Sequence, residues 1–415
     1  MAEERLPNRW MFVVWALIMQ LCLGNLYTWS IFRTPLMKAY GWTIQQATWP
    51  FTLSVVFFAV GMVFAGRWQD KAGPKIVAIT GGIILGAGFL LASVVGNTLA
   101  GIYIAYGVLG GLGVGFAYVT PIAVCVKWFP DMRGFITGLA VLGFGAGSMI
   151  GAPVGTTLIG RIGPLGTYAV FGIVFGILVA LAGSQLKNPP AGYRPAGWSP
   201  PAPAAGKPAV TKYDYAPTEM VKTPQFWLLW FIYLFGAGVG LMVISQAVPM
   251  GVELTKATAA VAAAALGTMA IFNGLGRPAF GAISDKIGRS NATMLAFALY
   301  IVALLAVLRG ADSIALYTVG ISMVGFAYGG YLALMPSYTA DYFGTKNLGI
   351  NYGWVFSAWG AAGVLGPIIG AQVRAVTGAW TTAFWILSGL CVAGILLALI
   401  TKAPAAREVE APAKA

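Results

Sequence analysis

The stretch GRWQDKAGPK at residues 66–75 recurs as GAISDKIGRS at residues 281–290, and this repeat decides the fold. The second copy starts 215 residues after the first, and Pro121 and Pro336 are separated by the same offset. A constant offset between distant motifs is hard to produce by chance, so it predicts two related halves. Two parallel six-helix halves, related about an axis along the membrane normal, are a known plan for membrane transporters.

The composition of the chain supports a membrane setting for these halves. Hydrophobic residues make up 59% of the 415 residues and charged residues only 9%, against about 25% charged residues in soluble domains. Apolar segments of about 20 residues fit a bilayer core roughly 30 Å thick. We therefore predict an all-α membrane protein with twelve transmembrane helices in two six-helix halves, surrounded by the lipid bilayer. The expected spans are 10–32, 48–66, 75–96, 99–126, 134–159, 165–187, 225–248, 257–284, 291–309, 312–340, 347–375 and 380–402.

Four regions of the chain follow from these spans. The N-terminal six-helix half covers residues 1–187, and the C-terminal six-helix half covers residues 223–402. Residues 188–222 are rich in Pro and Ala and cannot build a core, so they are expected to form a flexible cytoplasmic linker. Residues 403–415 are expected to form a cytoplasmic tail.

The basic residues predict the orientation of the protein in the membrane. Even-numbered connections and both termini hold 18 of the 25 Lys and Arg residues, whereas odd-numbered connections hold six. The positive-inside rule therefore places both termini in the cytoplasm. The net charge of +13 does not indicate nucleic-acid binding, because the basic residues lie between apolar segments instead of on one face.

The residue types that serve catalysis and metal binding are scarce. The chain has no histidine, and its three cysteines lie within or at the edges of apolar segments. The acidic residues lie at the ends of the expected helices, in loops or in tails. We therefore expect no metal site, no cofactor and no enzyme activity. A membrane sensor or an integral-membrane enzyme is the remote alternative, although no soluble output domain is evident in the sequence.

Arg277 is the candidate binding residue for a substrate. It lies eight residues before Asp285, the expected helix end, and therefore about 12 Å inside the membrane at a rise of 1.5 Å per residue. An ionised Arg at that depth costs about 2.5–3.5 kcal/mol even on lenient scales. An anionic substrate would supply the missing countercharge, and a guanidinium fork matches a carboxylate. The alternative is an arginine satisfied by backbone carbonyls, water or Tyr rings.

Other mid-helix polar and aromatic residues are candidates for the same site. Asn273 lies one turn from Arg277 and is expected to bind substrate or, equally well, a neighbouring helix. Tyr118 and Tyr328 are expected to contact the substrate because buried phenols need a hydrogen-bond partner. Phe356 also lies mid-helix, and for each of these aromatic residues the alternative role is helix packing.

Asp70 and Asp285 occupy equivalent positions in the repeated loops. Each lies near a helix end on the expected cytoplasmic face, in a tight Gly-containing connection. We expect these two acids to make gating contacts that hold a conformation, and not to bind substrate.

The paired Gly-x-x-x-Asp-Lys-x-Gly loops resemble those of the major facilitator superfamily. More specifically, FNGLGRP at 272–278, KTPQFW at 222–227 and NYG at 351–353 look like motifs of the oxalate/formate antiporter group. That group is akin to the monocarboxylate transporters, which carry lactate and pyruvate with a proton. The resemblance covers nearly the whole chain outside the linker and is closest to a bacterial lactate-type monocarboxylate:proton symporter. It implies a multi-pass protein of the bacterial inner membrane.

The sequence departs from these families at three informative positions. The oxalate carrier has a lysine where this chain has Trp359, so a single cation favours a monocarboxylate over oxalate. The animal lactate carriers have an aspartate and a lysine where this chain has Asn273 and Leu26. The resemblance therefore implies proton symport, while the side chains usually credited with the proton are absent.

The combined expectation is a secondary transporter of small monocarboxylates that works by alternating access. The expected substrate is L-lactate, with pyruvate as a related acid, and the expected co-substrate is a proton. Leu26, Leu142 and Phe356 are expected to form an apolar wall sized for a short chain. An electroneutral organic-anion exchanger of the oxalate/formate type is the alternative, and the sequence gives no indication of an accessory subunit.

Overall fold

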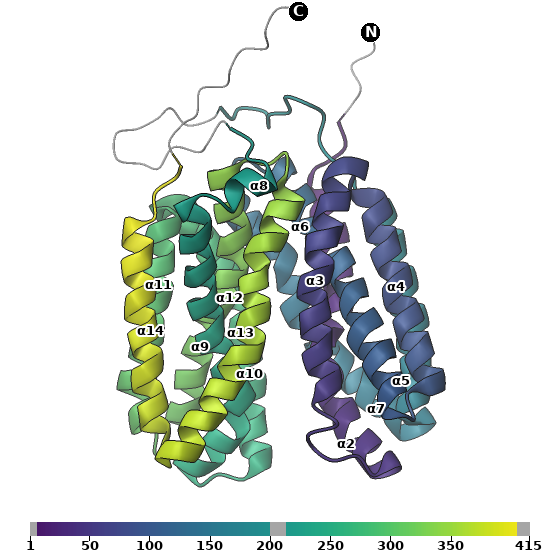
Figure 1. Ribbon diagram of the computed structural model, residues 1–415, viewed down its shortest axis with the longest axis vertical. Coiled ribbons are helices and arrows are strands. Elements are labelled where there is room, and N and C mark those ends of the chain that lie inside the picture. Colours follow the sequence, from purple (N-terminus) through teal and green to yellow (C-terminus); the bar gives the residue numbers. More distant parts are fainter. Residues whose placement is uncertain (1–5, 200–212, 405–415) are drawn as a thin grey trace, which may run out of the picture.

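The computed structural model describes residues 6–199 and 213–404, and in this part of the chain the regular structure is helical. Figure 1 shows the helices as two bundles that stand side by side. Eleven segments of the described chain are long and apolar enough to cross a membrane. One of them, α7 (Arg133–Ser184), is interrupted by the non-helical backbone of Gly163, where φ is 74°, and supplies two crossings. The prediction of an all-α membrane fold is therefore confirmed.

The first bundle contains the crossings that precede the expected linker. Its helices are α1 (Trp10–Leu23), the 3₁₀ stretch η1 (Gly24–Thr28), α2 (Trp29–Tyr40), α3 (Trp49–Ala72), α4 (Pro74–Val95), α5 (Leu99–Ile102), the π stretch η2 (Tyr103–Gly110), α6 (Gly111–Trp128) and α7. The first crossing thus changes its helical pitch at Gly24. A Cβ atom at Gly24 would collide with the carbonyl of Phe144, so the glycine allows α7 to lie directly against this crossing.

The second bundle begins with a helix whose N-terminus is capped by a side chain. Its elements are α9 (Pro224–Thr255), α10 (Ala259–Ile287), α11 (Arg289–Ile301), η3 (Val302–Val307), η4 (Leu308–Gly310), α12 (Ile314–Phe343), α13 (Leu348–Thr377) and α14 (Trp380–Ile400). The Thr223 side chain accepts a hydrogen bond from the backbone N–H of Phe226, and Pro224 occupies the first helical position. This is the arrangement expected of an N-cap followed by a first-turn proline.

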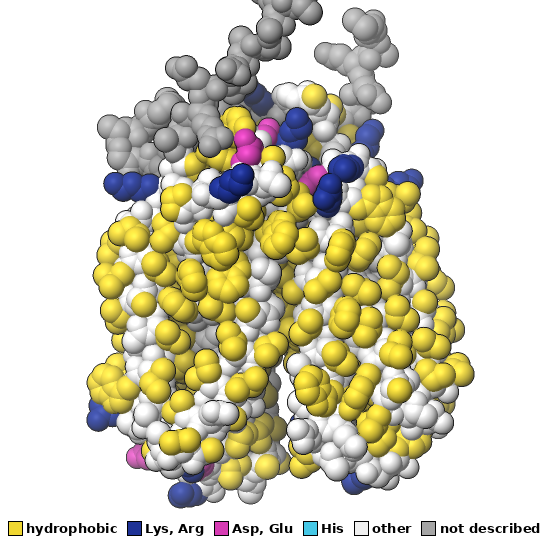
Figure 2. All heavy atoms as spheres, viewed as in Figure 1, with side chains coloured by type: hydrophobic (Ala, Val, Ile, Leu, Met, Phe, Trp, Pro, Cys, Tyr) yellow, Lys and Arg dark blue, Asp and Glu magenta, His cyan; other side chains and the backbone are white. Residues whose placement is uncertain are grey.

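The two bundles meet along a seam on which α3 packs against α13 and α7 packs against α10. The start of α1 and the end of α14 lie at the same end of the molecule (Figure 1), which we call the terminal end. Figure 2 shows Lys and Arg side chains gathered at the terminal end of this face, and a cleft between the bundles toward the opposite end. The described structure is therefore closed at the terminal end.

Residues 213–222, at the end of the expected linker, lie against the second bundle. The Asp214 carboxylate accepts hydrogen bonds from the backbone N–H groups of Thr345 and Lys346, at 2.9 and 3.0 Å. The Tyr215 carbonyl accepts from the Asn351 side chain at 3.0 Å. The short helix α8 (Pro217–Met220) follows and lies over the terminal end (Figure 1). Residues 200–212 of the expected linker and 405–415 of the expected tail lie outside the described residues.

Candidate functional site

Arg277 is fully buried within α10, and its exposed fraction is 0%. One terminal nitrogen of the guanidinium donates to the carbonyl of Val141 on α7. The Nε atom and the other terminal nitrogen donate to Oδ1 of Asn273, at 3.3 and 3.2 Å. No acidic residue in the described chain forms an ion pair with Arg277. Neutral dipoles therefore orient the cation while its charge has no counterion among these residues.

Asn273 serves as the positioning partner of Arg277 in this conformation. The two residues are one turn apart on α10, and the amide oxygen accepts from two guanidinium nitrogens. Asn273 is only partly buried, and it lies one turn farther from the terminal end than Arg277. The side-chain amide oxygen of Asn273 therefore faces the guanidinium from the side away from the terminal end, where the bundles diverge.

The glycine-rich part of α7 makes room for the guanidinium. A Cβ atom at Gly145 would lie 3.1 Å from Cζ of Arg277, so a larger side chain would press against the cation. Leu142, one of the expected wall residues, is partly buried on the same helix and faces α10 near Gly274. The structure thus brings Leu142 and Asn273 to the neighbourhood of Arg277.

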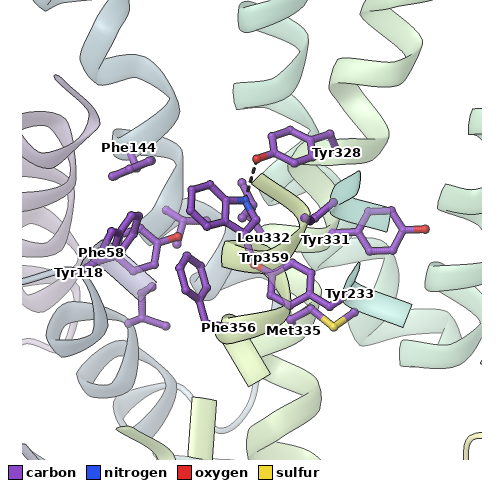
Figure 3. Close-up of a cluster of buried hydrophobic side chains, with 14 of the residues drawn as sticks. Phe58, Tyr118, Phe144, Tyr233, Tyr328, Tyr331, Leu332, Met335, Phe356 and Trp359 are labelled. Atoms are coloured by element: carbon purple, nitrogen blue, oxygen red, sulfur yellow. Dashed lines mark hydrogen bonds between the residues drawn. The ribbon is translucent and has the colours of Figure 1, made fainter. Parts of the chain in front are cut away.

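An aromatic layer spans the two bundles (Figure 3). The Phe58 ring of α3 lies 5.0 Å from the Phe356 ring of α13 between centroids, and Tyr118 of α6 lies 5.6 Å from Phe356. The indole N–H of Trp359 donates to the Tyr328 hydroxyl at 2.8 Å. Tyr118, Phe356 and Tyr328 are therefore brought together, with Trp359 joining α13 to α12 in the same layer.

Tyr27 belongs near this site, although the sequence interpretation did not include it. Its ring packs edge-on against Phe144 at 5.3 Å, and its side chain lies within electrostatic range of Arg277. Leu26, the expected wall residue, is buried, and its backbone carbonyl accepts from the Tyr106 hydroxyl at 3.0 Å. Tyr27 lies in the 3₁₀ stretch η1, and a pattern of apolar residues does not reveal that change of pitch.

Two aspartates close the terminal end of the seam in equivalent ways. The Asp285 carboxylate accepts from the backbone N–H groups of Gly134 and Phe135, both at 2.9 Å, and we call this contact the α10 latch. The Asp70 carboxylate accepts from the backbone N–H groups at the start of α13, and we call this contact the α3 latch. Its partners are Gly349 at 3.1 Å and Ile350 at 2.9 Å.

Each latch joins the end of a helix in one bundle to the first turn of a helix in the other. The first N–H groups of a helix have no partner within the helix, and the positive end of the helix dipole favours an acid there. A Cβ atom at Gly66 or Gly349 would collide with backbone of the facing helix, so these glycines allow α3 and α13 to approach closely.

Comparison with known proteins identifies the family. The family model described as Major Facilitator Superfamily matches residues 14–308 and 238–415. An oxalate:formate antiporter from Oxalobacter formigenes is 31% identical over 384 residues, which cover 92% of this chain and 88% of the antiporter. Monocarboxylate transporter 13 from Bos taurus is 23% identical over 392 residues, which cover 93% of this chain and 87% of that transporter.

A solved structure confirms the arrangement of the helices. The Major Facilitator Superfamily transporter FucP, solved in the outward conformation, superposes with a TM-score of 0.69 at 16% sequence identity. The superposition covers 94% of this chain and 98% of FucP. The chain therefore belongs to the Major Facilitator Superfamily and is a membrane transporter.

Proposed function

We propose that this transporter carries small monocarboxylates, with L-lactate as the principal substrate and a proton as the co-substrate. The observation that carries the proposal is the fully buried Arg277 guanidinium, which forms no ion pair within the described chain. Intramembrane charges mark substrate pathways by default. A carboxylate that bound the guanidinium fork would neutralise this charge through charge-assisted hydrogen bonds.

The preference for a single carboxylate follows from the count of cations. Trp359, at the position where the oxalate carriers have lysine, donates its indole N–H to Tyr328 and contributes an apolar ring to the layer. A dicarboxylate would leave its second charge against these rings, and desolvating an unpaired charge is costly. The names of the relatives, a monocarboxylate transporter and an oxalate:formate antiporter, agree with small carboxylates as the substrate class.

Transport would proceed by alternating access, with the two bundles rocking about Arg277. The α3 and α10 latches would hold the terminal end closed and release when it opens, which would give Asp70 and Asp285 a gating role. The excess of basic residues at the terminal end places that end in the cytoplasm, so both termini would be cytoplasmic in a bacterial inner membrane. The described conformation would then be closed to the cytoplasm.

The proton would bind after the anion. The sequence has no histidine, and no acid in the described residues pairs with Arg277. A free carboxylic acid has a pKa of about 4, and pairing with a cation lowers the pKa further. Carriage of the neutral acid against Arg277 is therefore disfavoured, whereas a site completed by water and a Tyr hydroxyl could fill once lactate has arrived.

Uptake of radiolabelled lactate into proteoliposomes, with and without an imposed pH gradient, tests this function. Symport predicts uptake that increases when the outside is more acidic and that needs no anion inside. An electroneutral exchanger is the second candidate because of the similarity to the oxalate:formate antiporter. An exchanger predicts uptake that does not depend on the pH gradient and that requires an anion inside the vesicles. A sensor or an enzyme would give no uptake.

A further inference from the structure

A long groove runs along the outer side of the seam between α3 and α13. Its volume is about 930 Å³, and side chains of both bundles line it. On α3 the lining residues extend from Val56 to Lys71, and on α13 they extend from Ile350 to Val364. At a rise of 1.5 Å per residue, these stretches are about 22 and 21 Å long. The groove is therefore slightly longer than one leaflet of a bilayer, whose whole hydrocarbon core is roughly 30 Å thick.

The part of the groove away from the terminal end is apolar and open to the outside. Val60, Phe64 and Trp354 line it and are exposed. Ser357 lines it as well, but its hydroxyl donates to the carbonyl of Trp354 at 2.6 Å and accepts from the indole N–H of Trp230 at 3.0 Å. Figures 1 and 2 show α3 and α13 on the near face, with hydrophobic side chains along them. In a membrane this surface would face lipid, so an acyl chain is the expected occupant.

Two cations stand at the terminal end of the same groove. Arg67 and Lys71 are four residues apart, which places them on one face of α3, and both are exposed. Neither forms an ion pair with an acid in the described chain. Asp70 also lines this end, but its carboxylate accepts from the backbone N–H groups of Gly349 and Ile350 in the α3 latch. The groove therefore combines an apolar channel with two cations that are available to an anion.

The second half of the chain does not repeat this pair of cations. The positions 215 residues after Arg67 and Lys71 are Ala282 and Lys286. The α10 latch thus forms with an alanine at the position equivalent to Arg67. A latch of this kind therefore does not require the arginine, which points to a different role for Arg67 on the α3 side.

We propose that one anionic phospholipid binds in this groove, with its phosphate on Arg67 and Lys71 and an acyl chain along the apolar part. Guanidinium and ammonium groups bind phosphate through charge-assisted hydrogen bonds. Basic pockets between transmembrane helices on the cytoplasmic side bind lipid head groups, and the proposed orientation places the terminal end on that side. A zwitterionic lipid would bring a cation of its own next to Arg67 and Lys71, so the site would select a head group with a net negative charge.

The bound lipid would favour the closed terminal end. It would contact α3 of the first bundle and α13 of the second, and Pro217 and Thr218 of the docked segment also line the groove. When the bundles separate at this end, the walls of the groove move apart and the lipid keeps its contacts with only one of them. A ligand shifts an equilibrium toward the conformation that it binds better. The lipid would therefore support the α3 latch.

Native mass spectrometry of the full chain in detergent tests the site, with titration of phosphatidylglycerol or of phosphatidylcholine that has the same acyl chains. We expect one phosphatidylglycerol to bind the native protein at least tenfold more tightly than phosphatidylcholine. Arg67→Gln combined with Lys71→Gln should weaken phosphatidylglycerol binding about 30-fold, the loss expected for two basic residues near a membrane surface. The matched control is Lys286→Gln combined with Lys402→Gln, which removes two exposed cations elsewhere and should change binding less than about threefold.

A second variant tests the apolar part of the groove without changing its charge. Ala361 lines the groove and is half-buried, so Ala361→Trp should fill the space that the acyl chain needs. We expect phosphatidylglycerol binding to weaken about tenfold. Leu396→Trp, at an exposed position on α14 outside the groove, is the control and should bind as the native protein does. Phosphatidylcholine binding close to the native value reports that each variant is folded.

Four results would contradict the lipid site. Equal binding of the two lipids, or an equal loss in the Lys286 and Lys402 control, would mean that Arg67 and Lys71 do not select the head group. Native-like binding by Ala361→Trp would mean that the lipid is attracted to the surface without entering the groove. Displacement of the lipid by inorganic phosphate at the same concentration would assign the two cations to a small anion instead.

Discussion

The α10 latch and the α3 latch share their chemistry but differ in what surrounds them. In both, an aspartate at the end of one helix accepts hydrogen bonds from two backbone N–H groups at the start of a helix in the other bundle. Asp70 and Asp285 are 215 residues apart, as are Gly134 and Gly349. The repeat therefore contains both the aspartate and the glycine whose backbone N–H donates to an aspartate.

The α10 latch is embedded in a network of ion pairs. Arg289 bonds to Asp285 at 2.7 Å and to Asp341 at 2.8 Å, and Arg133 of the other bundle bonds to Asp341 at 2.8 Å. These side chains are 12–19% exposed, so water screens the pairs only partly.

The α3 latch is supported instead by the segment that precedes α9. At the positions equivalent to Arg289 and Asp341, the first half has Pro74 and Val126, which cannot form ion pairs. The Asp214 carboxylate accepts hydrogen bonds from the backbone of the loop before α13. This loop lies a few residues from the N–H groups that donate to Asp70. One side of the closed end is thus held by charged side chains and the other by a docked segment of chain, so each can be weakened separately.

Asp341→Asn should produce the largest shift in the closed population. It removes the shared acid of Arg133 and Arg289, and breaking a buried ion pair costs about 3 kcal/mol or more. We expect the ratio of closed to open protein to fall about 100-fold. Double electron–electron resonance between spin labels at the terminal ends of the two bundles would measure this ratio. Asp312→Asn, at an exposed loop residue, is the control and should leave the distances unchanged. Unchanged distances in Asp341→Asn would mean that the network does not hold the latch.

Asp285→Asn and Asp70→Asn compare the latches directly. Both variants lose charge-assisted hydrogen bonds to backbone N–H groups, which are worth about 1.5–3 kcal/mol. Asp285→Asn also leaves Arg289 with one acid instead of two, so its shift toward the open state should be the larger. The same distance measurement provides the check, and equal shifts, or a larger shift for Asp70→Asn, would contradict the asymmetry.

Asp214→Ala should give the smallest effect and should act on the α3 side alone. The lost bonds to Thr345 and Lys346 resemble a lost N-cap, which costs about 1 kcal/mol. We expect label distances across α3 and α13 to broaden, while those across α7 and α10 stay as in the native protein. Broadening of both pairs to the same degree would mean that the docked segment supports the closed end as a whole.

The all-α membrane fold could be predicted because each apolar segment is local in the chain, and the burial of Arg277 could be predicted because the residue lies inside one such segment. Pairing of each aspartate with one particular helix start could not be predicted, since Asp70 and Gly349 are 279 residues apart. The ion pair between Arg133 and Asp341 was missed for the same reason, with a separation of 208 residues. Docking of residues 213–222 was hidden by a composition typical of linkers, and Tyr27 was hidden by the change of helical pitch in η1.

Binding of L-lactate to native protein and to Arg277→Lys, by isothermal titration calorimetry in detergent, tests the central claim that the Arg277 guanidinium binds the carboxylate. Lysine keeps the charge but loses the planar fork and the bonds to Asn273. The control is Arg374→Lys, which alters a partly exposed arginine paired with Glu253 and should leave affinity unchanged. We predict a Kd about 100-fold weaker in Arg277→Lys, because two hydrogen bonds to a charged group are lost or distorted. A Kd within about threefold of the native value would contradict bidentate recognition by Arg277.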